Sequence, residues 1–174
     1  MAARRSSPTP HAKSPKAKER ELLMTHVFDA SRALVWAAWT ERQHLERWQG
    51  APKGFTVTTA ESDIRPGGAF RIRMRSPEGV DHWLQGVYRE VVPPERLVFT
   101  HTWLDAERKP TTETLVTITF AERGPKTELT LRQTGFKSDE SRTGHEGGWA
   151  STFERLADYL ASERSNPSAA ARKS

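Results

Sequence analysis

The sequence predicts a single α+β domain in which a long C-terminal helix packs on a curved antiparallel sheet. Three observations support this fold class: a strand followed by two short helices, a central region in which apolar residues recur at every second position, and a final stretch with helical periodicity. A chain of 174 residues is long enough for one well-cored domain and too short for two. Since the apolar face of the sheet must be covered, and only the terminal helix is long enough to cover it, we expect the two to pack together.

The chain opens with a strand and two short helices. Residues 22–28 are rich in apolar, β-branched and aromatic side chains, which is typical of a strand. Asp29 and Ser31 are both candidate N-caps for a helix over residues 33–39. Thr40 is placed to cap a second helix over residues 41–48, which a glycine and a proline then end.

Six strands are predicted in the central region. Phe70, Ile72 and Met74 alternate with three arginines, so this strand has one core face and one solvent face. Gly67 and Gly68 precede it in a tight turn. The short connections between strands predict a six-stranded antiparallel meander. The strands are expected over residues 57–64, 70–75, 82–92, 97–103, 115–120 and 128–134.

The last part of the chain predicts a long amphipathic helix. Thr143, with Glu146 three residues later, fits a capping box, so we expect the helix to begin there. Gly147 and Gly148 are interpreted as permitting a close approach of this helix to the sheet. Apolar side chains recur at i, i+4, i+7 and i+11, on Trp149, Phe153, Leu156 and Leu160.

The positive charge of the chain, a net +5, is concentrated at its two ends. Residues 1–20 carry six basic side chains and one acidic side chain, and residues 161–174 carry three basic side chains and one acidic side chain. The remaining 140 residues carry 18 basic and 20 acidic side chains. The central region is therefore not basic, which argues against a domain that binds nucleic acid. We predict a disordered basic tail over residues 1–20, a folded domain over 21–162 and a disordered tail over 163–174.

Composition excludes several further classes of protein. No apolar run approaches the roughly 18 residues that a membrane-spanning helix needs. The absence of cysteine excludes disulfides, thiolate metal sites and a cysteine nucleophile, and makes the cytoplasm the expected compartment. We expect no membrane partner, no specific nucleic acid, and a monomer or homodimer.

Histidines are the main candidates for chemistry. His82, His101 and His145 are expected near the junction of sheet and terminal helix, where they are either general bases or simply packed or surface side chains. No histidine pair has metal-ligand spacing, and no serine elbow or phosphate-binding loop is present. We therefore predict no catalytic residue, no metal and no cofactor. Glu61 and Asp63 are interpreted as ion-pair partners of neighbouring arginines rather than as paired catalytic carboxylates.

Three separated motifs carry a family resemblance: IRPGGAF at residues 64–70, GVYREVVPPERLVFT at 86–100 and HEGGW at 145–149. Together with the element order, they resemble the activator of heat-shock-protein-90 ATPase homologue-like branch of the SRPBCC superfamily over residues 21–162. This superfamily has the helix-grip fold of START-like and birch-pollen-allergen-like proteins. Eukaryotic activators resemble this chain only in their C-terminal part, and their ATPase stimulation depends on a separate N-terminal domain for which the sequence offers no segment. The family name alone is therefore not expected to give the function.

The resemblance implies a cavity between the sheet and the terminal helix, suited to a small apolar ligand. The same aromatic and aliphatic residues could instead fill a closed core. The leading hypothesis is a non-catalytic protein that binds a small hydrophobic ligand. A co-chaperone-like module that stimulates a chaperone ATPase is the first alternative, and a cyclase- or hydrolase-like enzyme is the second. The predicted ligand-binding residues are Phe70, Ile72, Met74, Tyr88, Phe99, His101, Trp103, Val116, Ile118, Leu129, Leu131, Trp149 and Phe153.

Overall fold

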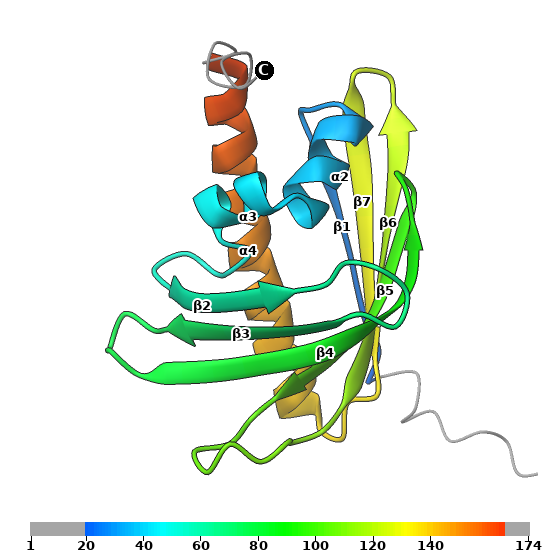
Figure 1. Cartoon of the computed structure of the whole chain (residues 1–174). Helices are drawn as coiled ribbons and strands as arrows, with labels where there is room; N and C mark the ends of the chain where they lie inside the picture. The colour runs from blue at the N-terminus through cyan, green and yellow to red at the C-terminus, as the bar shows by residue number, and fades with distance from the viewer. Residues whose placement is uncertain (1–19, 166–174) are drawn as a thin grey trace, which may run out of the picture.

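The computed structural model describes residues 20–165 and contains the predicted elements in the predicted order (Figure 1). The strand and two short helices that open the chain are β1 (Leu22–Phe28), α2 (Arg32–Thr40) and α3 (Arg42–Trp48). The strands that follow are β2 (Thr56–Ser62), β3 (Ala69–Arg75), β4 (Asp81–Val92), β5 (Arg96–Trp103), β6 (Thr114–Arg123) and β7 (Lys126–Thr134). The chain then forms the long helix α4 (Asp139–Ser165).

All seven strands belong to one antiparallel sheet in the order β1-β7-β6-β5-β4-β3-β2. The six later strands form the predicted meander, and β1 is added beside β7. The sheet curves strongly, so that β2, β3 and β4 run across the direction of β1, β7 and β6, and the helices lie within the curve (Figure 1). The fold class predicted from the sequence, a helix-grip fold, is confirmed.

Two predicted helix starts were wrong. Helix α4 begins at Asp139 rather than at Thr143, because Ser138 supplies an earlier cap: its Oγ accepts a hydrogen bond from the backbone N–H of Ser141 at 3.1 Å. Thr40 does not cap α3. It is the last residue of α2, and its hydroxyl donates to the Trp36 carbonyl at 2.8 Å.

The ends of the chain fall largely outside the described structure. Helix α4 continues through residues 163–165, which the sequence assigned to the C-terminal tail. One reason for the longer helix is that Glu163 forms an ion pair with Arg47 of α3. Residues 1–19 and 166–174, where the two tails were predicted, lie outside the described residues.

The core forms where α2 and α4 meet the sheet. Val116 and Ile118 of β6, with Leu129 and Leu131 of β7, have no exposed surface, and Phe153 of α4 is 2% exposed. The predicted alternation on these strands is therefore confirmed. Helices α2 and α4 supply further buried side chains, among them Val35, Trp39, Leu156 and Leu160.

Glycines serve different purposes in the sheet and in α4. Gly67 has φ of +83°, and a Cβ on Gly68 would lie 1.9 Å from the Asp63 carbonyl oxygen, so the predicted tight turn is confirmed. In α4, by contrast, a Cβ on Gly147 or Gly148 would meet nothing within 4 Å outside the helix. The interpretation that this pair permits a close approach to the sheet was wrong.

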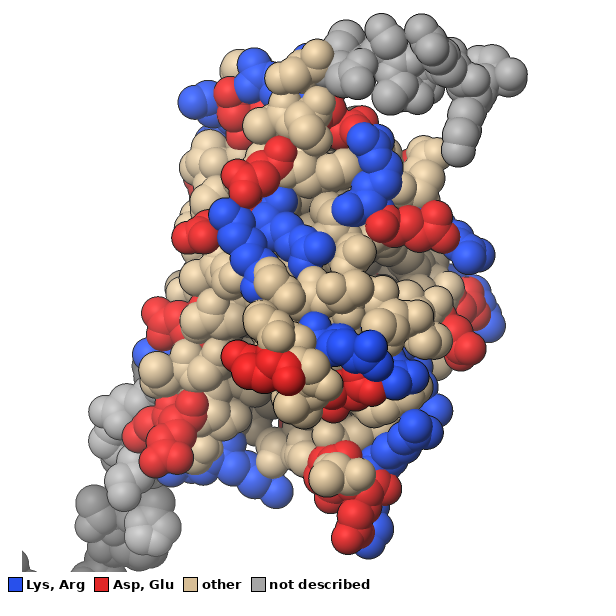
Figure 2. All heavy atoms as spheres, turned by 90° about the vertical axis from the view of Figure 1, so that its left-hand side faces the viewer, with Lys and Arg blue, Asp and Glu red and all other residues tan. Residues whose placement is uncertain are grey.

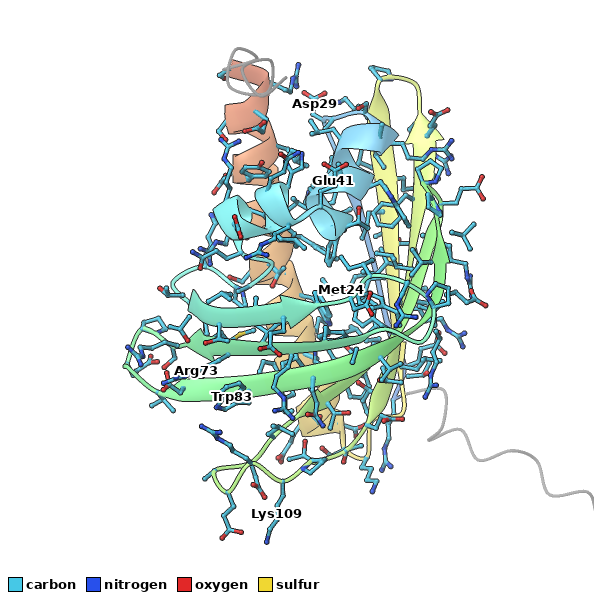
Figure 3. All side chains as sticks on the ribbon, viewed as in Figure 1. Met24, Asp29, Glu41, Arg73, Trp83 and Lys109 are labelled. Carbon is cyan, nitrogen blue, oxygen red and sulfur yellow. The ribbon has the colours of Figure 1, made fainter. Side chains whose placement is uncertain are left out.

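The outer surface carries charges of both signs. Arg73 of β3 and Trp83 of β4 are register neighbours and lie side by side, with the guanidinium 5.7 Å from the ring centroid (Figure 3). Arg73 and Arg75 both pair with Asp81, while Asp63 pairs with Arg65 at 2.7 Å. Figure 2 shows acidic and basic side chains interspersed on one face of the molecule. Exposed pairs of this kind contribute at most about 1 kcal/mol each.

Candidate functional site

Two pockets lie inside the curve of the sheet. The large pocket has a volume of about 750 Å³ and is enclosed by strands β2 to β5, by α2 and α3, and by Trp149 of α4. The small pocket, of about 310 Å³, lies between β3 to β5 and the N-terminal half of α4. The two pockets share the wall residues Gly50, Leu84, His101 and Trp149.

The inner part of the large pocket is apolar and its rim is polar. Aromatic and aliphatic side chains from the sheet and α2 line the interior, namely Trp39, Phe70, Ile72, Leu84, Tyr88, Leu97 and Phe99. The polar lining residues come mainly from α3 and β2, namely Arg42, Glu46, Gln49, Thr58, Thr59, Glu61 and Ser62. Almost all of β2 is exposed. The pocket therefore opens between α3 and the β2 edge of the sheet.

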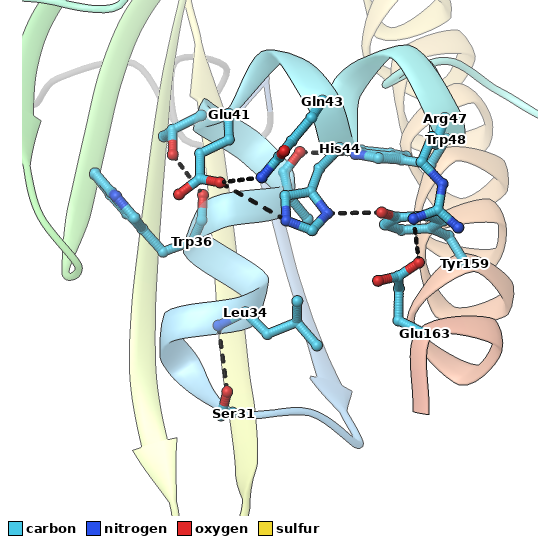
Figure 4. Close-up of polar contacts among 12 residues, drawn as sticks. Ser31, Leu34, Trp36, Glu41, Gln43, His44, Arg47, Trp48, Tyr159 and Glu163 are labelled. Atoms are coloured by element: carbon cyan, nitrogen blue, oxygen red, sulfur yellow. Dashed lines mark hydrogen bonds and ion pairs between the residues drawn. The ribbon is translucent and has the colours of Figure 1, made fainter. Parts of the chain in front are cut away.

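Helix α3, one lip of this opening, is held firmly on α4. The Nδ1 atom of His44 and the hydroxyl of Tyr159 are 2.6 Å apart, and Arg47 forms its ion pair with Glu163 one turn further along α4 (Figure 4). On its other side, the buried Trp48 donates from Nε1 to the Ala38 carbonyl at 2.7 Å. The position of the lip is thus set by contacts with both other helices.

The segment between α3 and β2 is also fixed on α4. The Arg155 guanidinium donates to the carbonyls of Pro52 and Phe55 at 3.0 and 2.8 Å, and partial burial lowers the pKa of this guanidinium. Gln49 lies in the left-handed region with φ of +70°, and its side-chain oxygen accepts from the Val57 N–H at 2.8 Å. This bond spans the end of the opening between α3 and β2.

A buried hydrogen-bond chain positions His101 at the wall between the pockets. Trp149 Nε1 donates to Gln133 Oε1 at 2.8 Å, and Gln133 Nε2 donates to Thr114 Oγ1 at 2.8 Å. The Thr114 hydroxyl in turn donates to the backbone carbonyl of His101 at 2.9 Å. The chain connects α4 to β7, β6 and β5, so it couples the helix to the strand that carries the histidine.

His101 is an uncharged imidazole in an apolar setting. The side chain is 5% exposed, and its Nδ1 atom is buried without a hydrogen-bond partner. Burial, with a smaller contribution from His145, lowers the pKa of His101 to about 3. The two rings are 5.5 Å apart between centroids. His101 is therefore neutral at physiological pH.

His145 has a defined tautomer. Because the indole N–H of Trp103 can only donate, the Nε2 atom of His145, 3.1 Å away, must accept. Its Nδ1 atom then carries the proton and donates to the Ser141 carbonyl at 2.7 Å. Both nitrogens are thus engaged: the bond from Trp103 joins β5 to α4, and the bond to Ser141 lies within α4.

The predicted ligand-binding residues separate into two groups. Phe70, Ile72, Tyr88 and Phe99 line the large pocket, Met74 and Trp103 line the small one, and His101 and Trp149 line both. The remainder lie in the closed core and line neither pocket, since α2 packs on β6 and β7 and Phe153 itself belongs to α4: Val116, Ile118, Leu129, Leu131 and Phe153.

Sequence reasoning missed part of the lining and misplaced one histidine. Trp39 and Leu45 line the large pocket from the helices, and Leu84 lines both pockets. Leu84 shares its alternation with Tyr88, a signal that could have identified it. His82 is exposed near the start of β4, the strand that also carries Leu84, and its ring lies near Phe55 and Trp103. It lines neither pocket.

Two further kinds of feature are absent from residues 20–165. No group of three or more histidine, aspartate or glutamate side chains is placed to hold a metal ion there. No helix in the same range is both long and apolar enough to cross a membrane.

Comparison with known proteins identifies the family. A family model described as activator of Hsp90 ATPase homolog 1-like protein matches residues 29–161. The chain belongs to this family. No curated protein matches this AHSA1-like chain.

Solved structures share the fold of this AHSA1-like protein. An AHSA1 protein from Silicibacter pomeroyi is 26% identical, with a TM-score of 0.74 over 82% of this chain and 99% of that one. A protein from Chromobacterium violaceum is 27% identical, with a TM-score of 0.72 over 81% and 96%. A protein from Nitrosomonas europaea is 26% identical, with a TM-score of 0.70 over 84% and 97%.

Proposed function

We propose that this AHSA1-like protein binds a small, mainly apolar molecule in the large pocket. The observation that carries the proposal is the pocket itself. Its volume of about 750 Å³ lies in the range of about 300–1,000 Å³ typical of small-molecule sites, and aromatic and aliphatic side chains surround its interior. Such a lining favours a ligand that buries apolar surface when it binds.

The glycines of α4 support a role for open space beside the sheet. Gly144 and Gly148 line the small pocket, and a Cβ on either would meet nothing within 4 Å outside the helix. Glycine within a helix costs about 1 kcal/mol relative to alanine. Packing does not explain this cost at either position, whereas preservation of an open pocket does.

The titration behaviour of the pocket histidine favours binding over catalysis. A general base works best when its pKa lies near the working pH. His101, with a pKa of about 3, is too weak a base for that role at neutral pH. The proposal is therefore a binding protein rather than an enzyme.

The apolar surface favours a ligand-binding function over a co-chaperone function. An interaction module needs a contiguous exposed apolar patch. Leu23 and Val27 are exposed on β1, but their register neighbours on β7 are Arg132 and Glu128. Charged side chains thus interrupt this apolar surface.

The proposal is tested with the neutral fluorescent dye N-phenyl-1-naphthylamine. We expect saturable one-to-one binding to the full chain, with a negative heat-capacity change because apolar surface is buried. Ile72→Trp places a large ring in the pocket and should weaken binding. Arg71→Trp is the matched control, because Arg71 is the preceding residue of β3 and lies on its exposed, opposite face.

Two results would contradict the proposal. The first is an absence of saturable dye binding by the folded wild-type protein. The second is equal binding by the Ile72→Trp and Arg71→Trp variants, which would place the dye elsewhere. If dye binding is absent and the protein stimulates a purified chaperone ATPase in a saturable way, the co-chaperone alternative replaces the proposal.

A further inference from the structure

Two residues that line the large pocket each carry a buried side-chain nitrogen without a hydrogen-bond partner. One is Nδ1 of His101 and the other is Nε1 of Trp39, and both side chains are less than a tenth exposed. Trp149 lies near both, with ring centroids 5.9 Å from His101 and 6.3 Å from Trp39. A buried polar atom is normally paired, so each of these two requires an explanation.

The surrounding network does not supply partners for these atoms. The neighbouring polar side chains are occupied: Trp149 donates to Gln133, and both nitrogens of His145 are engaged. The hydrogen-bond chain through Thr114 reaches only the backbone carbonyl of His101 and leaves its Nδ1 atom without a partner. Both unpaired side chains belong to the lining of one pocket, so a molecule in that pocket is the natural source of partners.

The two atoms specify what kind of group they recognise. The Trp39 indole N–H can only donate, and a neutral imidazole offers one donor and one acceptor. A hydroxyl can donate or accept and therefore pairs with either side chain, whereas a carbonyl oxygen pairs with the Trp39 N–H and with the tautomer of His101 that carries its proton on Nδ1. A carboxylate would bring a charge into an apolar wall where the neutral His101 supplies no opposite charge, and burial of an unpaired charge is strongly unfavourable.

We infer that the ligand is a neutral, mainly apolar molecule that places a hydroxyl or carbonyl group against the wall formed by Trp39, His101 and Trp149. This inference rests on the proposed function, and it names the class of ligand. The mainly apolar interior accommodates the body of such a molecule, and the unpaired nitrogens recognise its polar group.

The test compares three competitors of N-phenyl-1-naphthylamine that differ in a single group: biphenyl, 4-phenylphenol and biphenyl-4-carboxylate. The measured quantity is the ratio of the dissociation constants of biphenyl and 4-phenylphenol. The His101→Phe and Trp39→Phe substitutions should each lower this ratio about three- to tenfold. This factor corresponds to the net contribution of one hydrogen bond to the binding free energy. If a substitution disturbs the pocket and weakens the binding of both competitors by the same factor, the ratio of their dissociation constants does not change.

His82→Phe is the matched control, because His82 lies on β4 outside both pockets, and it should leave the ratio unchanged. As a measurement that needs no variant, the imidazole ¹⁵N signals of His101 in the wild-type protein should shift with 4-phenylphenol and not with biphenyl. The wild-type protein should also bind 4-phenylphenol more tightly than biphenyl-4-carboxylate at pH 7.4.

Each outcome decides between the inference and the function on which it rests. If the ratio stays at its wild-type value in both pocket variants, or the carboxylate binds as tightly as the phenol, the inference is overturned while apolar binding stands. If none of the competitors displaces the dye because the dye does not bind, the proposed function fails, and the inference fails with it.

Discussion

Replacement of Gln133 tests whether the hydrogen-bond chain from α4 to His101 holds the helix on the sheet. The side chain has no exposed surface, and its amide makes two hydrogen bonds of 2.8 Å, one from Trp149 and one to Thr114. Gln133→Met keeps a similar shape and removes both bonds. At about 1 kcal/mol for each, the free energy of unfolding should fall by about 2 kcal/mol. This loss corresponds to a decrease in Tm of roughly 4–8 °C.

Urea unfolding, followed by circular dichroism, measures this loss. Gln43→Met is the matched control, since Gln43 is exposed and bonds only Glu41, and it should change stability by less than about 0.5 kcal/mol. The double variant Gln133→Met/Trp149→Phe should be about 1 kcal/mol more stable than additivity predicts, because one hydrogen bond is lost in both single variants. A Gln133→Met protein as stable as the control would refute the reasoning.

Two further predictions concern α4 and the acid response. Gly147→Ala and Gly148→Ala should each raise the free energy of unfolding, measured in urea, by up to about 1 kcal/mol, because each added Cβ meets open space. A loss of stability would show that α4 lies closer to the sheet. Unfolded His101 takes up a proton below its ordinary pKa of 6.5, whereas in the folded protein its pKa is about 3. Stability should therefore fall with decreasing pH between these values, by up to about 1.4 kcal/mol per pH unit from this group. His101→Phe should reduce the slope of the unfolding free energy against pH in that window, and an unchanged slope would show that this histidine does not titrate as described.

Local patterns were sufficient for the order and type of the elements. Strand β1 was predicted with its observed bounds, and the alternation around Ile72 and Val116 identified which face of each strand is buried. These signals depend on residues close together in the chain, because side chains on a strand alternate between faces. Helix starts were less certain, because both Ser138 and Thr143 have a side chain suited to capping, and only the hydrogen bond actually formed decides between them.

The sequence by itself determined the α+β fold class and the inward-facing aromatic side chains, but it did not determine where the interior is closed and where it is open. Ile118 and Phe99 look alike in the pattern, yet Ile118 lies in the closed core on β6, against which α2 packs, while Phe99 lines the large pocket. The difference arises from the curvature of the sheet and the line that α4 takes across it. The same geometry leaves Nδ1 of His101 without a partner and the ring close to Trp149, because hydrogen bonds between residues far apart in the chain depend on tertiary packing rather than on local periodicity.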